Sequence, residues 1–203
     1  MEKNIYPGKF VVFEGLDGSG QSTETDVLTA YLKQKDIDVL ATKEPTKESE
    51  AGKRIRKILD EKENIAPLEL QKLFAEDRAW HLQNVITPAL KQGKTVISDR
   101  YFFSSFAFGA SDGIEKKELY KMNREFLMPD IVFFLDAGPK ICLGRIEVRG
   151  GKKKLFEKKE KLEKVYENYK LIFKDFKDKT KIHFIDAKGS IKQVFEQIIA
   201  NLN

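Results

Sequence analysis

Short apolar runs alternate along the chain with segments in which apolar residues recur every three or four positions. The periodic segments predict amphipathic helices, and the short runs predict strands. The run Ile131–Leu135 is apolar at every position, which is typical of a strand buried on both faces. Regular alternation of strands and helices predicts an α/β fold, a five-stranded parallel sheet with helices on both faces. The five strands are expected at residues 10–14, 38–42, 95–98, 131–135 and 182–186.

The expected helices are placed by apolar spacing and by residues that begin or end a helix. Leu28, Tyr31 and Leu32 recur at helical spacing behind the first strand. Pro67, at a position suited to a first helical turn, opens a longer helix that extends past Trp80 to Leu82. The remaining helices are expected around residues 55–59, from about 104, and over 115–127, 139–148, 155–176 and 190–202. Because ligands of parallel sheets bind at the carboxyl ends of the strands, the candidate site lies at that edge.

A glycine-rich turn joins the first strand to the first helix. Its sequence is Gly15-Leu16-Asp17-Gly18-Ser19-Gly20-Gln21-Ser22-Thr23. A strand, a glycine-rich turn and a helix in this order are the context of a phosphate-binding loop. Backbone N–H groups and the positive end of the helix dipole then face the phosphates, and the Ser22 hydroxyl is the expected ligand of Mg²⁺. The nucleotide-binding residues are therefore expected to be Gly15, Gly18, Ser19, Gly20, Gln21, Ser22 and Thr23.

One position departs from the loop motif G-x-x-x-x-G-K-[ST]. Gln21 stands where the motif has lysine. A lysine ammonium reaches the β- and γ-phosphates, whereas the glutamine amide is neutral and shorter. By analogy with the removal of one oxyanion donor, the change costs on the order of 3–4 kcal/mol of transition-state stabilisation. The loop thus leaves two interpretations open: a working phosphoryl-transfer enzyme, and a degenerate protein that binds nucleotide without turnover.

Composition limits the class of protein and its location. The 203 residues contain no repeat and no low-complexity linker, which predicts a single domain over residues 1–203. The single cysteine, Cys142, lies between Ile141 and Leu143 on an expected helix, so we expect a core residue and no internal disulfide. No run of eighteen apolar residues and no signal-peptide pattern occurs, so a cytoplasmic location and no membrane partner are expected.

The positive charge is concentrated in one segment. The net charge is +5, and residues 150–181 carry twelve lysines against six acidic residues, so the remainder is about neutral. A basic segment this short is better suited to binding a polyphosphate than to binding nucleic acid. The alternative is that its lysines form the solvated face of a helix. No nucleic-acid partner is therefore expected.

Four motifs in the same order resemble the thymidylate kinase family, nucleoside-monophosphate kinases of the P-loop class, and the resemblance runs from about Phe10 to the C-terminus. The motifs are Glu14–Gly20, Lys43–Lys47, Leu73–Arg78 and Asp99–Gly109. The resemblance implies a P-loop NTPase fold with a lid over about 149–157, and a homodimer. It implies Mg²⁺-dependent transfer of the γ-phosphoryl group from ATP to dTMP, giving dTDP. The alternatives are a kinase of another nucleoside monophosphate and a catalytically degenerate nucleotide-binding protein.

The resemblance also implies which residues hold the acceptor nucleoside. Asp17 corresponds to an aspartate that contacts the sugar 3′-hydroxyl. Phe74 corresponds to a ring that stacks on thymine, and Arg78, one helical turn later, to an arginine that hydrogen-bonds the base edge. Many bacterial relatives have Tyr-Gln where this chain has Phe108-Gly109. Further pocket residues implied by the resemblance are Ser104, Phe108 and Tyr169, with plain core packing as the alternative for Tyr169.

The resemblance assigns the phosphates to cationic residues. Asp99 is expected to orient the Mg²⁺ shell, and Arg100 to clamp the acceptor phosphate and the transferring group. Relatives carry an arginine near Lys47 for the acceptor monophosphate, so Lys47 is favoured here and Lys43 is the other choice. The catalytic residues implied are Asp17, Arg100 and Arg149.

A lid cation is expected because relatives with an arginine inside the loop use it in catalysis, and this chain has Gly18 at that place. Arg149 is the expected replacement, and the lysines at 152–154 could offset part of the charge missing at Gln21. Arg145 is expected to point either at the donor phosphates or into solvent. The segment Asp186–Ser190 resembles the family's loop beside adenine.

The two histidines, His81 and His183, receive no role. Neither has cysteine or histidine neighbours at a zinc-binding spacing, and no Ser/His/Asp arrangement is indicated. The implied chemistry needs no general base with a raised pKa, because the attacking oxygen belongs to a phosphate.

Overall fold

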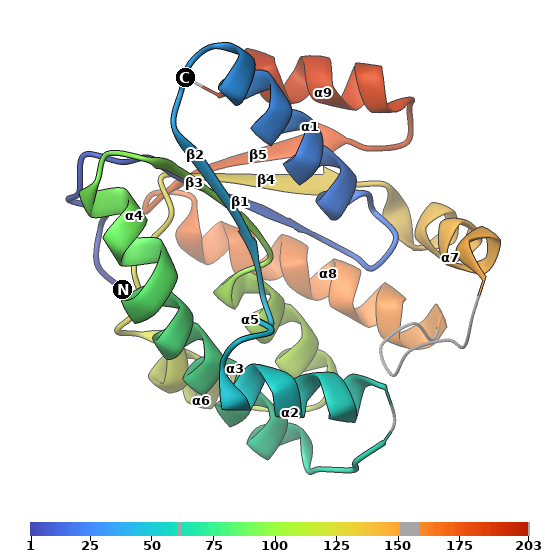
Figure 1. The fold of residues 1–203 in the computed structure, drawn as a ribbon. Coiled ribbons are helices and arrows are strands. Elements are labelled where there is room, and N and C mark those ends of the chain that lie inside the picture. The colour runs from blue at the N-terminus through green and yellow to red at the C-terminus, as the bar shows by residue number, and fades with distance from the viewer. Residues whose placement is uncertain (61, 151–158, 203) are drawn as a thin grey trace.

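Five parallel strands form the central sheet of the protein (Figure 1). The computed structural model describes residues 1–60, 62–150 and 159–202. The strands are β1 (Phe10–Gly15), β2 (Val39–Lys43), β3 (Thr95–Asp99), β4 (Ile131–Asp136) and β5 (Lys181–Asp186), in the spatial order β2-β3-β1-β4-β5. Each strand agrees with its expected position to within one residue at either end. The predicted α/β class and the parallel sheet are confirmed.

Helices cover both faces of the sheet. Figure 1 shows α1 and α9 on one face and α3, α5 and α8 on the other. None of the helices within the described residues is both long enough and apolar enough to cross a membrane. The helices are α1 (Gln21–Gln34), α2 (Glu50–Leu59), α3 (Pro67–His81), α4 (Thr87–Lys91), α5 (Phe102–Ser111), α6 (Lys116–Asn123), α7 (Gly138–Arg149), α8 (Lys159–Phe176) and α9 (Ile191–Ala200).

The long helix expected from Pro67 to Leu82 ends at His81, one residue before its expected end. A π-helical segment that was not predicted, Leu82–Ile86, joins it to α4. Pro88 has no N–H group, so the carbonyl of Asn84 lacks its usual α-helical donor and the wider turn precedes the proline. Four other boundaries differ from expectation by two residues or more: α2 begins five residues earlier, α5 begins two residues earlier, α6 ends four residues earlier and α9 ends two residues earlier. Residues 155–158 of the expected helix 155–176 lie outside the described residues.

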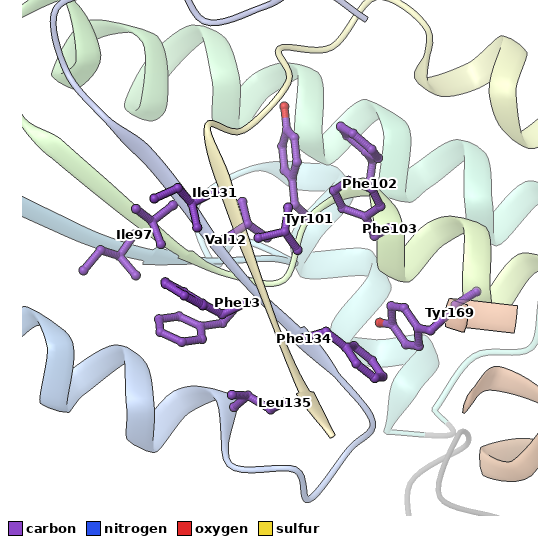
Figure 2. Packing of buried hydrophobic residues seen from close by; sticks show 14 of the residues in the cluster. Val12, Phe13, Ile97, Tyr101, Phe102, Phe103, Ile131, Phe134, Leu135 and Tyr169 are labelled. Carbon is purple, nitrogen blue, oxygen red and sulfur yellow. The ribbon is translucent and has the colours of Figure 1, made fainter. Parts of the chain in front are cut away.

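Aromatic side chains fix α5 and α8 against the sheet. Figure 2 shows Phe134 of β4 facing Tyr169 of α8, with ring centroids 5.1 Å apart, and Tyr101, Phe102 and Phe103 clustered at the start of α5. Phe176 of α8 packs against Phe102 and Phe103 at 5.8 and 5.1 Å. Edge-to-face and tilted ring pairs of this kind stabilise beyond the area they bury. The packing therefore fixes the start of α5 against the C-terminal end of α8.

Cys142 of α7 is fully buried, as expected of a core residue. Burial raises the pKa of its thiol to about 12, because the thiolate would be poorly solvated. The thiol is therefore an apolar packing group.

The strand order brings three polar strand ends together. β3 lies between β2 and β1, and Lys43 and Asp99 occupy paired positions at their carboxyl ends. Asp99 is also paired with Phe13, two residues before the glycine-rich loop begins. One edge of the sheet thus carries the loop, a lysine and a carboxylate side by side.

Candidate active site

A cavity of about 350 Å³ lies at this edge of the sheet. Side chains from all four sequence motifs line it. The lining includes seven of the residues expected at the site: Asp17, Phe74, Arg78, Arg100, Ser104, Phe108 and, from outside the motifs, Arg149. The other lining residues are Lys43, Glu44, Pro45, Arg56, Leu59, Asp60, Gln71, Tyr101 and Ser105. The fold therefore brings together segments that are up to 132 residues apart (149 − 17) in the chain.

The glycine-rich loop has the backbone shape of an anion site. Gly18 and Gly20 have φ of +85° and +105°, in the left-handed region that glycine adopts at little cost, and Gly20 is the N-cap residue of α1. A Cβ at position 18 would lie 2.6 Å from the carbonyl oxygen of Cys142. Packing against α7 therefore explains why no arginine stands at this place in the loop. Gly15 ends β1, Ser19 is buried and Thr23 is exposed on the first turn of α1.

Gln21, which replaces the motif lysine, is buried and turned toward Arg100. Its Oε1 accepts hydrogen bonds from Ser19 Oγ at 3.3 Å and from Arg100 at 3.2 Å. Its Nε2 is buried and has no hydrogen-bond partner among the described residues. Buried donors are nearly always satisfied, so this N–H₂ group fits an acceptor such as a phosphate oxygen of a bound nucleotide.

Ser22 and Asp99, the two residues expected to hold Mg²⁺, contact each other. The Ser22 hydroxyl donates to Asp99 Oδ2 at 2.5 Å, and Asp99 Oδ1 is buried without a partner in the described part of the chain. A hydroxyl and a carboxylate suit Mg²⁺, which is usually bound by one or two protein oxygens together with water and substrate phosphates. Within residues 1–60, 62–150 and 159–202 no group of three His, Cys, Asp or Glu residues could enclose a metal. The site therefore fits a cation that is shared with a nucleotide.

Arg100 lies at the centre of the site. It donates to Asp17 Oδ1 at 2.7 Å, to the Gly15 carbonyl at 2.9 Å and to Ser104 Oγ at 2.9 Å. Burial disfavours its charge, but the carboxylates of Asp17 and Glu14 outweigh this and raise the pKa of Arg100 above its usual range. Its φ is +76°, an unusual value for a residue with a Cβ, which is retained only where surrounding contacts enforce it. The contacts therefore hold a permanently charged guanidinium in one place.

Glu14 is a buried acid at the end of β1 to which the sequence assigned no role. It accepts hydrogen bonds from the Tyr101 and Ser104 backbone N–H groups at 3.0 and 3.2 Å, and from the Ser104 and Tyr169 hydroxyls at 2.7 and 2.8 Å. Burial raises the pKa of Glu14 to about 7, against the opposing effect of Arg100 and of these donors. A charged residue inside an otherwise apolar strand was the sequence feature that could have identified it.

The raised pKa of Glu14 should make the free energy of unfolding depend on pH. Because its folded pKa of about 7 exceeds its usual 4.5, the folded chain binds more protons between these values. The free energy of unfolding should therefore fall as pH rises from about 4.5 to about 7, by about 3 kcal/mol from this group. Glu24, whose pKa burial also raises to about 7, adds to the same slope. Urea unfolding across this pH range should show a shallower slope in Glu14→Gln, and an unchanged slope would contradict the assignment.

Tyr169 is buried on α8 and reaches the site only through its hydroxyl. Besides Glu14, the hydroxyl contacts Ser104 Oγ at 2.8 Å and Arg100 at 3.4 Å, and the ring packs against Phe134 and Phe173. It is not among the side chains that line the cavity. Tyr169 thus joins core packing to the Arg100 cluster, and a direct contact with the acceptor stays a prediction.

Phe74 and Arg78 line the cavity from one face of α3, one turn apart. Phe74 is partly buried, whereas Arg78 is almost fully buried. Arg78 donates from Nε to Glu44 Oε2 at 2.8 Å, from Nη1 to Asn123 Oδ1 at 2.6 Å and from Nη2 to Ser105 Oγ at 3.1 Å. These three partners hold its guanidinium plane against the cavity wall.

Glu44 links Arg78 to a histidine that the sequence left without a role. The second carboxylate oxygen of Glu44 lies 3.1 Å from His81 Nδ1, and His81 Nε2 lies 2.6 Å from the Thr42 hydroxyl. All of these groups except Thr42 are buried. The sequence offered one hint, an acidic residue directly before the proline that ends a strand. His183 lies instead in β5 beside Phe133, and burial lowers its pKa.

Gly109, one of the positions at which the sequence departs from the pattern expected on the family resemblance, faces α6. A Cβ at this position would lie 2.6 Å from Leu119 Cδ2. A larger residue here would require the Leu119 side chain to move. Phe108 itself is buried at the cavity wall, and its ring centroid lies 5.5 Å from the Arg100 guanidinium carbon.

Lys47, favoured from the sequence for the acceptor phosphate, is exposed and does not line the cavity. The cause is Thr46, whose backbone N–H and hydroxyl both bond to the buried Asp77 carboxylate, at 2.8 and 2.6 Å, so that the next residue is turned outward. Lys43, the other choice, lines the cavity. So does Arg56, which the sequence did not single out and which donates to the carbonyls of Pro45 and Thr46.

Of the expected lid, the structure describes Arg149 and Gly150, whereas the lysines at 152–154 lie outside the described residues. Arg149 ends α7 at the cavity wall. Arg145 donates to the Ala187 carbonyl at 2.8 Å and to the Ser19 carbonyl at 3.3 Å. It therefore binds the glycine-rich loop to the segment after β5, which is neither of the two placements expected from the sequence.

Comparison with known proteins agrees with these motifs. A sequence model described as thymidylate kinase matches residues 13–198. A protein of Caldicellulosiruptor saccharolyticus named "Thymidylate kinase" is 39% identical over 197 residues, which are 94% of each chain. A protein of Pyrococcus horikoshii named "Probable thymidylate kinase" is 37% identical over 198 residues, which are 95% of each chain. The resemblance inferred from the motifs is confirmed, and the chain belongs to the thymidylate kinase family.

Proposed function

We propose that this protein transfers the γ-phosphoryl group of ATP to dTMP, giving ADP and dTDP, with Gln21 in place of the usual loop lysine. The observation that carries the proposal is one cavity lined both by Asp17 and Arg100 beside the glycine-rich loop and by Phe74 and Arg78 of α3. Its volume of about 350 Å³ falls in the range of small-molecule sites. Donor phosphates at the loop and an acceptor in the cavity would then meet at Arg100.

Arg100 is the residue best placed to join the two nucleotides. Its contacts with Asp17 and Gln21 join one guanidinium to the aspartate proposed to bind the sugar and to the residue that replaces the loop lysine. A planar fork can bind oxygens of two phosphate groups, and phosphoryl transfer depends mainly on positioning and charge. Bound Mg²⁺, held by Ser22 and Asp99, would neutralise charge on the donor phosphates. Arg149 is our candidate for the cation that closes over the transferring group.

No side chain needs to remove a proton in this reaction. The attacking oxygen belongs to the acceptor phosphate, which is largely ionised at neutral pH, so the raised pKa of Glu14 implies no general base. Glu14 instead positions Ser104 and Tyr169, both of which contact Arg100. We assign it a positioning role.

The acceptor base is recognised, in this proposal, by Phe74 and Arg78. The Phe74 ring stacks on the pyrimidine. Arg78 Nη1 carries two N–H groups and gives one to Asn123, which leaves the second for a carbonyl of the base. The homodimer and the cytoplasmic location are proposed on the family resemblance.

A panel of nucleoside monophosphates tests the proposal. In an assay that couples ADP formation to a spectroscopic readout, dTMP should give the highest kcat/KM, above dUMP, dCMP and dGMP. Faster turnover of another monophosphate would favour a kinase of that nucleotide, for which the departures at Lys47 and Phe108-Gly109 are the sequence argument. If calorimetry detects ATP and dTMP binding but no ADP forms, the protein is a degenerate nucleotide-binding member of the family.

A further inference from the structure

The loop of this chain lacks a positive charge that its chemistry requires. Gln21 is neutral, and its oxygen is already engaged by Ser19 and Arg100, so its side chain offers the phosphates one amide N–H₂ group. A neutral donor cannot follow charge that moves to the leaving oxygen as an ammonium does. A working enzyme therefore needs another cation within reach of the donor phosphates.

An ammonium group lies beside the loop. Lys43 Nζ lies 2.9 Å from Ser22 Oγ and forms an ion pair with Asp99 Oδ2. Ser22 is the residue next to Gln21, near the end of the glycine-rich loop that is proposed to hold the phosphates. Lys43, at the end of β2, reaches it across the end of β3, because the two strands pair Lys43 with Asp99.

The Lys43 side chain is only half enclosed by its neighbours. Half of its surface is exposed to solvent, whereas the Asp99 carboxylate that it contacts is buried. A lysine on a flexible four-carbon stem can transfer its ammonium between neighbouring oxygens at low cost. The oxygens that would enter beside Ser22 when a nucleotide binds are those of the donor phosphates.

The present partners of Lys43 also explain why it would move. Ser22 and Asp99 are the two groups that fit Mg²⁺, and one carboxylate oxygen cannot hold an ammonium and a divalent cation equally well, because the two cations repel each other. When the metal takes Asp99, the ammonium is left with the phosphate oxygens as the nearest anions.

We propose that Lys43 supplies, from the end of β2, the ammonium that Gln21 does not supply from the loop. This proposal rests on the proposed function and assigns Lys43 to the donor and transferring phosphates rather than to the acceptor phosphate alone. The positive charge that the motif places on the loop would thus be supplied from the end of β2.

A double-mutant cycle on Gln21 and Lys43 tests this assignment. We expect Lys43→Met to lower kcat by about 10²–10³-fold in the wild-type background, as for the removal of one preorganised donor. In Gln21→Lys, the loop has its own ammonium, so the same change should cost less than about tenfold. Equal losses in the two backgrounds would overturn the proposal. Lys53→Met, at an exposed lysine of α2 outside the cavity, is the matched control and should leave kcat unchanged.

A binding measurement separates the donor and acceptor roles without turnover. Titration of dTMP into the Lys43→Met variant by calorimetry, with neither ATP nor Mg²⁺ present, should give a dissociation constant within about threefold of wild type. A loss of tenfold or more would show that Lys43 holds the acceptor phosphate and would overturn the proposal. If wild type forms no ADP while Gln21→Lys does, the proposed function itself fails. If wild type forms ADP and the effects of the Gln21 and Lys43 substitutions on kcat are additive, the role proposed for Lys43 is refuted and the proposed function stands.

Discussion

Replacing Arg100 with glycine should lower kcat/KM for dTMP by about 10³-fold or more while the protein still folds. Arg100 joins Asp17, the Gly15 carbonyl, Ser104 and Gln21 in one cluster, so its loss removes both charge and positioning. Arginines that act on a transferring phosphoryl group are worth about 10³–10⁵ in kcat. Steady-state kinetics with dTMP and ATP measures the effect.

Glycine is the informative replacement because of the backbone at this position. With φ at +76°, any residue that carries a Cβ is strained, and glycine relieves that strain. Arg100→Gly should therefore melt at a higher temperature than Arg100→Ala, although both lose the guanidinium. Arg100→Lys keeps a charge without the fork and should fall between wild type and glycine in activity. Activity of Arg100→Gly within tenfold of wild type would refute the central role.

Replacing Glu44 with glutamine should lower the free energy of unfolding by about 3–5 kcal/mol. Glu44 and Arg78 are 2% and 1% exposed, and they form an ion pair at 2.8 Å. Removing one member of a buried pair leaves the other charge without compensation, which costs about this much. Urea denaturation at constant pH measures the change.

Two further variants show whether the buried charge is the cause. Replacing both members, as Glu44→Gln with Arg78→Met, should recover much of the lost stability, because no uncompensated charge remains. Glu69→Gln breaks an exposed ion pair with Lys72 on α3, the helix that carries Arg78, and should lower the free energy of unfolding by less than about 1 kcal/mol. A double variant as unstable as Glu44→Gln would mean that packing, and not charge, holds this wall. The double variant should also bind dTMP more weakly, since it lacks Arg78.

Strand and helix positions could be predicted because they depend on near neighbours. The apolar runs and the residues that end them located all five strands to within one residue at either end. The π-helical segment was not predicted, because no helical residue was assigned between Leu82 and the third strand and Pro88, which follows the segment, was not considered. The loop was recognised for the same local reason, since strand, glycine-rich turn and helix are contiguous.

The site was predicted where a motif is contiguous and missed where partners come from distant segments. Phe74, Arg78 and Arg100 were found and line the cavity. Glu14, Glu44 and His81 were not assigned roles, because nothing near them in the chain shows that they are buried or which groups they contact. Lys47 was preferred over Lys43 on the family resemblance, but the buried contacts of Thr46 with Asp77 leave Lys47 exposed, and Lys43 lines the cavity instead.

The order of residues alone was enough to establish the α/β class, the phosphate-binding turn and the missing lysine, because these follow from local periodicity and from which side chain stands at one place. Strand order, burial and the pairing of charges were decided only by tertiary packing. β3 lies between β2 and β1, and this arrangement places the Lys43 ammonium on Ser22 and Asp99. The physical reason is that contacts between residues tens of positions apart depend on how whole elements pack, and no short stretch of sequence records that packing.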